Sequence, residues 1–293
     1  MSLSKRISLP GFDGISIFNV ASFFLKELFE GDIQTRARSI AFSFFLALFP
    51  TVIFLFTLIP YVPIAGFQEK LLSSLQSFFP YNTYDAARTT IEEIVTNQNG
   101  GLLSFGFLFA VFVSTNGVNS IISSFDKTLF AEHKRSGIRK RIVALYLTCL
   151  LAVLTIIAIV LIIATELVLL FINKEILSLD RSSVYLLMIG KYLILVILCF
   201  TAISSLYYFG PSGGRNKFRF ISAGSTLATI LVLLTSICFN FFIQNFGNFN
   251  KVYGSIGTLI VILIYINFNC LQLLIGFELN NSINKAKIKP VRN

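Results

Sequence analysis

Residues 142–172 read IVALYLTCLLAVLTIIAIVLIIATELVLLFI, an apolar run that contains a single charged residue, Glu166. A helix needs about 20 apolar residues to cross the hydrocarbon core of a bilayer, and runs of about 18 or more indicate a membrane span. The run is longer than either value. It therefore predicts a transmembrane helix rather than the core helix of a soluble domain.

Five more apolar runs of this length occupy most of the remaining chain. They cover residues 39–61, 101–125, 184–209, 220–246 and 254–279. The six runs contain only Glu166, Lys191 and Glu278, although the chain has 24 Lys and Arg and 14 Asp and Glu. The mean hydropathy is +0.79 and the charged fraction is 13%, whereas soluble domains have about 25% charged residues. The predicted fold is an all-α polytopic membrane protein with six transmembrane helices.

Amphipathic segments are expected beside the spans. Residues 15–30 place apolar side chains at helical spacing, namely Ile17, Ala21, Phe24 and Leu28. This pattern predicts an interfacial helix with that face on the membrane. Two short amphipathic helices, at 67–79 and 84–96, are predicted on the outer face. The chain thus divides into an N-terminal segment (1–38), a membrane domain (39–279) and a basic tail (280–293).

Basic residues alternate between the two sides of the predicted bundle. Eighteen Lys and Arg lie before the first span, in the connections 126–141 and 210–219, and after residue 280. Only five lie in 62–100, 173–183 and 247–253. Since cytoplasmic loops are enriched in Lys and Arg, both termini are expected in the cytoplasm. The net charge of +10 then favours anionic lipid headgroups on that side as partners, rather than nucleic acid.

Cysteine and histidine usage narrows the class of protein further. Cys149, Cys199, Cys238 and Cys270 lie far apart in separate runs, and His133 is the only histidine. Single buried cysteines behave as small hydrophobic residues, and one histidine does not build a metal site. The sequence also lacks a GxxxxGK[ST] loop. We expect no metal, no cofactor and no ATP-driven pumping.

Several segments, in order, resemble a known family. They are RARSIAFSFFLALFPTVIFLF at 36–56, GVNSIISSFDKTLF at 117–130, LYYFGP at 206–211, YGSIG at 253–257 and GFELN at 276–280. Together they resemble the YihY/BrkB family of bacterial inner-membrane proteins, over nearly the whole chain. The resemblance implies six spans in the bacterial inner membrane and a suspected role in transport.

Members of that family have also carried the label ribonuclease BN, and the residues argue against it. Hydrolysis of RNA needs metal-held carboxylates and histidines or an acid–base pair. The cytoplasmic segments offer Asp126, Glu132 and His133 without metal-ligand spacing. We therefore expect that the protein is not an enzyme.

Amide side chains within the apolar runs are candidates for a functional site. They are Asn116 and Asn119 in the second span, and Asn267, Asn269 and Gln272 in the last. An amide in hydrocarbon needs a hydrogen-bonding partner, so these side chains are expected to face the bundle interior. They either hold helices together or line a path for a polar substrate.

Two ion pairs are expected. Glu278 ends the last span on the side where Arg36 or Arg38 starts the first, and an ordinary interfacial ion pair there is the simplest interpretation. Glu166 and Lys191 lie about 9 and 10 Å below the outer ends of neighbouring antiparallel spans. Their pairing would offset much of the cost of two charges in hydrocarbon. The alternative is that Lys191 extends to the headgroups.

Proline and glycine mark further positions. Pro50, midway along the first span, predicts either a structural kink or a broken helix that lines a cavity. Tyr253, Gly254 and Gly257 open the last span, where glycines allow close helix packing and the helix N-terminus offers a place for an anionic headgroup. Gly224 and Ala228 form a small-xxx-small pair typical of helix packing.

Two functions remain open from the sequence. The first is a transporter or lipid-translocating protein, which the polar groups in several spans and the family resemblance favour. The second is a non-transporting membrane scaffold or envelope assembly factor, which the basic loop and the external amphipathic helices favour. A cavity lined by Asn116, Asn267, Asn269 and Glu278 would favour transport, and a close-packed bundle would favour the scaffold.

Overall fold

The structure is a computed structural model that describes residues 14–61, 72, 92–94, 96–129, 135–175, 181–212, 219–245 and 249–288. All regular elements in these ranges are helices, and six are long and apolar enough to cross a membrane, as predicted. These six are α2 (Ile33–Leu58), α5 (Gly100–Thr128), α6 (Gly137–Glu175), α7 (Arg181–Phe209), α8 (Ala223–Asn245) and α9 (Phe249–Ile288). The helix α1 (Ile17–Glu30) precedes them, and a short 3-10 helix, η2 (Ile59–Tyr61), follows α2.

Several helix ends differ from the sequence-based bounds. The first membrane helix begins at Ile33 rather than at residue 39, so that Arg36 and Arg38 lie within it. The last continues to Ile288, past the predicted end at residue 279. Its extension is stabilised by packing, because Ile283 and Ala286 are buried against α1. Of the two predicted external helices, only residue 72, residues 92–94 and residue 96 lie within the described residues.

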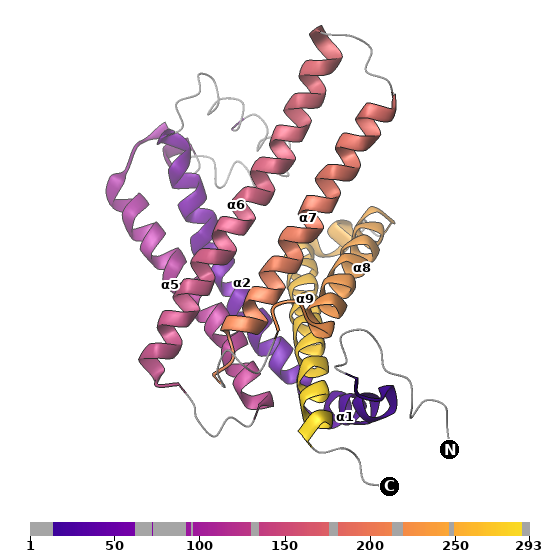
Figure 1. Cartoon of the computed structure of the whole chain (residues 1–293). Coiled ribbons are helices and arrows are strands. Elements are labelled where there is room, and N and C mark those ends of the chain that lie inside the picture. The colour runs from indigo at the N-terminus through magenta and orange to yellow at the C-terminus, as the bar shows by residue number, and fades with distance from the viewer. Residues whose placement is uncertain are drawn as a thin grey trace. The chain divides into compact units, whose positions relative to one another are not determined.

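The chain forms two compact units. The larger comprises Met1–Phe42 and Val118–Asn293, and the smaller comprises Ser43–Gly117. In the larger unit α6 packs on α7, α7 on α8, and α8 on α9 (Figure 1). The helix α1 lies across the C-terminal end of α9, with Val20 buried against Leu279, Ile283 and Ala286. Phe24, which the sequence placed on the membrane side of α1, packs against this same cluster.

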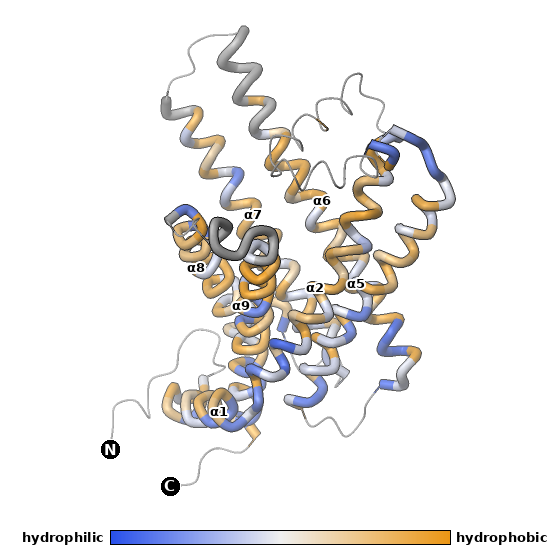
Figure 2. The backbone as a smooth tube through the Cα atoms, turned by 180° about the vertical axis from the view of Figure 1, so that it is seen from behind, coloured by the Kyte–Doolittle hydropathy of each residue, from blue (hydrophilic) through white to orange (hydrophobic). Residues whose placement is uncertain are grey.

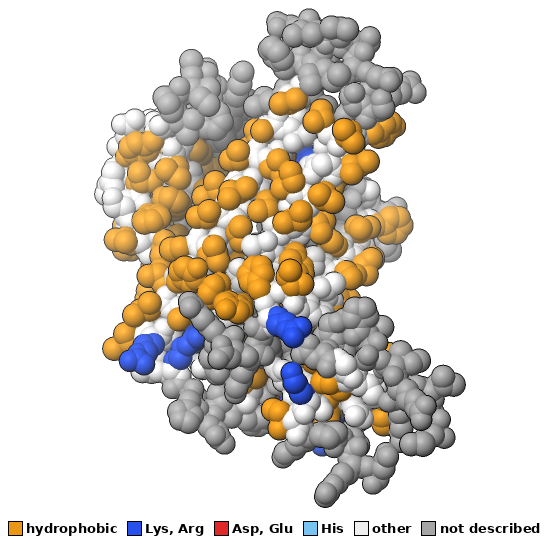
Figure 3. Space-filling model, in the orientation of Figure 1, with side chains coloured by type: hydrophobic (Ala, Val, Ile, Leu, Met, Phe, Trp, Pro, Cys, Tyr) orange, Lys and Arg blue, Asp and Glu red, His pale blue; other side chains and the backbone are white. Residues whose placement is uncertain are grey.

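Large side chains are buried in one region of the larger unit and exposed elsewhere. Phe125, Leu147, Tyr207, Leu274 and Phe277 are fully buried. By contrast, the described parts of α6 and α7 are mostly apolar (Figure 2), and many of their apolar side chains are exposed. Figure 3 shows this apolar surface, with most of the visible Lys and Arg towards the end where α6 begins. In a bilayer such a surface contacts lipid, because soluble proteins rarely expose an apolar patch of this extent.

The smaller unit is an antiparallel helix pair. Phe54 of α2 lies against Phe107 of α5, with ring centroids 5.4 Å apart, and a Cβ atom on Gly117 would lie 3.2 Å from the Phe44 ring. Pro50 is inside α2, which remains helical on both sides of it. The Thr51 hydroxyl donates to the Ala47 carbonyl at 2.7 Å in the same turn. The expected bend at Pro50 stays a prediction.

Candidate functional site

A buried ion pair joins the first and last membrane helices. The Arg36 Nη2 atom of α2 lies 2.8 Å from Glu278 Oε1 of α9, and the two side chains are 9% and 0% exposed. The sequence predicted an ion pair between Glu278 and either Arg36 or Arg38, and Arg36 is the partner. Arg38 is instead on the surface, where its guanidinium donates to Gln34 of the same helix at 3.4 Å.

Thr128, near the end of α5, links the two charges. Its hydroxyl accepts from Arg36 Nη1 at 2.5 Å and lies 2.6 Å from Glu278 Oε1. A hydroxyl has one proton to donate, and the short distance to the carboxylate indicates that Thr128 donates this hydrogen bond to Glu278. Thr128 is therefore a relay that accepts from the cation and donates to the anion.

The two terminal nitrogens of Arg36 also donate to backbone carbonyls. Nη1 donates to the Ser124 carbonyl of α5 at 3.2 Å, and Nη2 donates to the Gly31 carbonyl after α1 at 2.9 Å. One guanidinium thus contacts the end of α1, the end of α5 and the side of α9. The turn that positions Gly31 is tight, since Asp32 has a positive φ of 54°, a conformation uncommon outside glycine.

Two polar atoms of the pair have no hydrogen-bonding partner among the residues that the structure describes. Arg36 Nε and Glu278 Oε2 are buried and lack a hydrogen bond within the described residues. An ionised carboxylate accepts on both oxygens, so Oε2 has spare capacity for a proton, a water molecule or a polar ligand. Charged residues inside a membrane protein are costly and commonly functional, which makes this pair the centre of the candidate site.

An aromatic cluster packs beside the ion pair. The rings of Phe125 and Phe277 stack with centroids 4.0 Å apart, and the Tyr207 ring meets them edge-on at 5.6 and 5.7 Å. The Tyr207 hydroxyl donates to the Leu273 carbonyl at 2.7 Å. Phe125 and Phe277 are adjacent in sequence to Ser124 and Glu278. The cluster therefore keeps that side of the charged network free of bulk water.

Glycines bring α8 and α9 into close contact next to Tyr207 of this cluster. A Cβ atom on Gly276 would lie 2.5 Å from the Gly224 carbonyl oxygen and 2.7 Å from the Ala228 Cβ. The small-residue packing predicted at Gly224 and Ala228 is confirmed. Asn280 completes the contact, because its Oδ1 accepts from the Gly224 N–H at 2.8 Å and its Nδ2 donates to the Ser222 hydroxyl at 2.9 Å.

Side chains at the same end also connect α5, α6 and α7. The Asp126 carboxylate accepts from the Ser212 N–H at 2.9 Å and from its hydroxyl at 2.8 Å, and lies 3.3 Å from Lys140 Nζ. Arg135 donates to the Phe209 and Gly210 carbonyls, at 3.2 and 3.0 Å, at the end of α7. These bonds fix the helix ends that surround the site. Asp126 thus has a structural role.

The amides of α9 have mixed environments. Asn269 Nδ2 donates to the Tyr265 carbonyl at 2.8 Å, and Gln272 Nε2 donates to the Thr235 hydroxyl of α8. Asn267 Oδ1 and Gln272 Oε1 are buried without a partner within the described residues. Asn119 is half-buried in the larger unit.

The other predicted site residues lie elsewhere. Asn116 belongs to the smaller unit. Lys191 Nζ lies 5.1 Å from the centroid of the Tyr192 ring on its own helix. The structure describes the backbone but not the side-chain surroundings of Glu166, Tyr253 and Gly254. The Glu166–Lys191 pair therefore stays a prediction. Gly257 is buried within α9.

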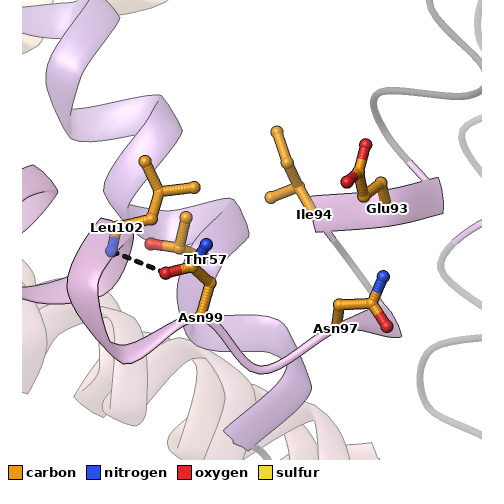
Figure 4. A pocket seen from close by; sticks show the side chains of 6 residues that line it. All are labelled: Thr57, Glu93, Ile94, Asn97, Asn99 and Leu102. Atoms are coloured by element: carbon orange, nitrogen blue, oxygen red, sulfur yellow. Dashed lines mark hydrogen bonds between the residues drawn. The ribbon is translucent and has the colours of Figure 1, made fainter.

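The smaller unit contains a separate pocket of about 260 Å³ (Figure 4). Its lining includes Thr57 at the end of α2, Glu93, Asn97 and Asn99. Asn99 Oδ1 accepts from the Leu102 N–H at 2.9 Å and so caps the start of α5. Glu93, Asn97 and Asn99 are exposed, which distinguishes this pocket from the buried ion pair. Within the part of the chain that the structure describes, no group of three or more His, Cys, Asp or Glu could hold a metal ion.

Comparison with known proteins identifies the family. The family model described as Virulence factor BrkB matches residues 24–292. The chain belongs to the BrkB family. The ribonuclease-like protein YfkH of Bacillus subtilis is 30% identical over 92% of this chain and 98% of its own length. A UPF0761 membrane protein of Haemophilus influenzae is 24% identical over 92% of this chain and 97% of its own. No solved structure matches the chain.

Four of the five segments that resembled the BrkB family meet at the candidate site. Arg36, Thr128, Tyr207 and Glu278 each come from a different one of the segments quoted for that resemblance. Sequence reasoning found Arg36 and Glu278 but missed Thr128 and Tyr207. Thr128 lies beyond the apolar run that ended at residue 125, and only its position inside the 117–130 segment could have signalled it.

Proposed function

We propose that this BrkB family protein is a multi-pass protein of the bacterial cytoplasmic membrane that translocates a lipid or a small polar solute. Both termini would face the cytoplasm. The distribution of Lys and Arg supports this orientation, because the segments at both ends and two alternate connections hold most of them. The buried ion pair then lies at the cytoplasmic end of the bundle.

Unsatisfied polar atoms on α9 carry the proposal. Asn267 Oδ1 and Glu278 Oε2 are both buried without a partner within the described residues. Eleven residues separate them, which places the two side chains within about 20° of each other around the helix and about 16 Å apart along it. Orphaned acceptors in a membrane span are costly unless water or a polar ligand visits them. Their presence in an apolar helix supports a path for such a ligand.

Other contacts of α9 favour the alternative of a non-transporting scaffold or envelope assembly factor. Asn280 bonds the start of α8, Gln272 bonds Thr235 of α8, and the Tyr265 hydroxyl lies 3.0 Å from the Ser236 hydroxyl. Interhelical hydrogen bonds of this kind hold membrane helices together without any transport. The two functions therefore need a direct test.

Reconstitution into liposomes separates the two functions. The purified protein would be inserted into vesicles that contain a lipid with a nitrobenzoxadiazole headgroup label, and dithionite would report movement of that lipid between leaflets. Parallel vesicles loaded with a panel of radiolabelled solutes would report solute flux. We expect a protein-dependent increase of at least tenfold in one of these assays.

A pair of variants on α9 controls for the role of Asn267. Asn267→Leu removes the unsatisfied acceptor at similar volume and should abolish most of the flux. Phe268→Leu changes the next residue, whose side chain is 45% exposed, and should leave the flux unchanged. Absence of protein-dependent flux for every lipid and solute tested would overturn transport and favour the scaffold.

A further inference from the structure

The surface of α1 is divided into three parts. At about 100° per residue, Leu25 and Phe29 lie about 140° and 180° from Val20, and Lys26 and Glu30 lie about 240° and 280° from it. Val20 is buried against α9. Lys26 and Glu30 are exposed charged residues that lie 3.8 Å apart. Leu25 and Phe29 are exposed apolar residues, 51% and 86% accessible.

Each of these parts matches a different environment. A helix at the edge of a membrane bundle has the bundle, the water and the lipid as neighbours. The side with Val20 is covered by the bundle, and the charged side suits water. An exposed apolar side on a membrane-surface helix is typical of insertion at the boundary between headgroups and acyl chains.

The level of α1 along α9 agrees with that boundary. Val20 packs on Leu279, the last residue of the apolar run, and on Ile283 and Ala286. From Leu279 to Ala286 the helix rises about 10 Å, and the headgroup layer on one side of a bilayer is about 5–8 Å thick. The helix α1 therefore crosses α9 directly beyond the last apolar residues, where the headgroups begin.

Two contacts fix α1 at this level. Lys285 Nζ of α9 lies 2.5 Å from Glu27 Oε1 of α1. The Gly31 carbonyl that follows α1 accepts from the same Arg36 nitrogen that pairs with Glu278. The orientation of the exposed apolar side is thus set by the bundle itself rather than by the lipid.

We propose that α1 inserts Leu25 and Phe29 into the acyl-chain boundary of the leaflet that borders the C-terminal end of α9, while its opposite side stays packed on α9. The proposal does not depend on which side of the membrane this leaflet faces. The membrane thereby gains a contact with the helix whose C-terminal cap, Gly31, is hydrogen-bonded to Arg36 of the buried ion pair.

Tryptophan fluorescence tests the proposal directly, because the chain contains no Trp. Phe29→Trp places a single reporter on the exposed apolar side, and Leu25→Trp is a second reporter on the same side. Glu30→Trp is the matched control on the charged side, one residue away. The full-length variants would be reconstituted into phosphatidylcholine and phosphatidylglycerol vesicles and titrated with acrylamide, with and without lipids brominated near the top of the acyl chains.

Brominated lipids should quench the Phe29→Trp and Leu25→Trp variants at least twofold more strongly than the Glu30→Trp variant, and acrylamide should show the reverse order. Equal quenching of all three variants by acrylamide would place α1 in water and overturn the proposal. Weak quenching of the Phe29→Trp and Leu25→Trp variants by both agents would mean that protein covers this side, and would overturn it as well.

Discussion

Arg36 uses both of its terminal nitrogens twice. Nη1 donates to Thr128 and to the Ser124 carbonyl, and Nη2 donates to Glu278 and to the Gly31 carbonyl. A planar guanidinium suits this arrangement because its donors point in fixed directions. A lysine at this position would offer one compact charge and fewer directed bonds. The residue thus positions the ends of α1 and α5 as well as neutralising one carboxylate of α9.

The ion pair gives the first prediction. Glu278→Gln leaves the Arg36 charge buried and unpaired, which should lower the free energy of unfolding by about 3–5 kcal/mol. Arg36→Met should be similarly costly. The double variant leaves no charge at either position. Its free energy of unfolding should fall by clearly less than the sum of the two single losses. Thermal unfolding in detergent, followed by circular dichroism, would measure the cycle.

Arg38→Gln is the control for this cycle. Arg38 lies two residues away in the same helix, and its bond to Gln34 is exposed. Its replacement should change the free energy of unfolding by less than about 0.5 kcal/mol. Additive losses in the Arg36→Met/Glu278→Gln variant would show that the two charges contribute independently, contrary to the 2.8 Å contact.

Sequence reasoning predicted the charged pair but not its third member. Glu278 and Arg36 are visible because charges are rare in apolar runs, and the depth of each can be counted from the run ends. The choice of Arg36 over Arg38 depends on the rotation of α2 about its axis, which hydropathy does not record. Thr128 is a common polar residue beyond a predicted span end. Only the packing of α5 against α9 gives it a role.

Among the helices, the contact of α8 with α9 depends on the absence of side chains. A methyl group on Gly276 would lie 2.5 Å from both the Gly224 carbonyl oxygen and the Tyr207 hydroxyl. Gly276→Ala should therefore force the helices apart and lower the free energy of unfolding by about 1–3 kcal/mol. Thermal unfolding in detergent would measure the loss.

Gly190→Ala is the matched control for this second prediction. Gly190 is inside α7, and a Cβ atom there would have nothing within 4 Å. Alanine is the better helix former by about 0.5–1 kcal/mol, so this variant should be neutral or slightly more stable. If Gly276→Ala lowered the free energy of unfolding no more than Gly190→Ala does, α8 and α9 would not be in close contact at Gly276.

A third prediction concerns α2. Pro50 has no N–H for the carbonyl four residues earlier, and its ring crowds that turn. Pro50→Ala should straighten the helix and lengthen the distance between spin labels at the exposed positions 38 and 55, measured by double electron–electron resonance. An unchanged distance would contradict the prediction, because it would mean that Pro50 does not bend α2.

The existence of the helices was easier to predict than their ends. Six apolar runs predicted six membrane helices, because the bilayer requires about 20 apolar residues per span. The helix ends in the structure differ from those predicted from hydropathy, because packing decides where a polar stretch stays helical. Residues 280–288 are helical since Ile283 and Ala286 pack on α1 and Asn280 bonds the start of α8. The apolar side of α1 was also misassigned in part, because α9 covers Phe24.

For the molecule as a whole, charge is distributed by side. The smaller unit is short of basic residues at the end that contains the pocket, where Glu93 is exposed. The segments 126–141, 210–219 and 280–293 are rich in Lys and Arg, and Arg135, Lys140 and Lys285 bind groups of the larger unit. Basic residues that also bind helix ends serve both the topology and the packing of the bundle.

This asymmetry gives the last prediction, which concerns orientation. In a background without the four native cysteines, Asn97→Cys places a thiol in the connection between α2 and α5, Gly137→Cys places one at the start of α6, and Ile288→Cys places one at the end of α9, all at exposed positions. The excess of Lys and Arg beside residues 137 and 288 should hold these two positions in the cytoplasm, whereas the connection 62–100 has only two basic residues. An impermeant maleimide added to intact cells should label the Asn97→Cys variant alone, and all three variants should react after permeabilisation. Labelling of the Gly137→Cys variant in intact cells would reverse the orientation, and with it the assignment of the buried ion pair to the cytoplasmic end.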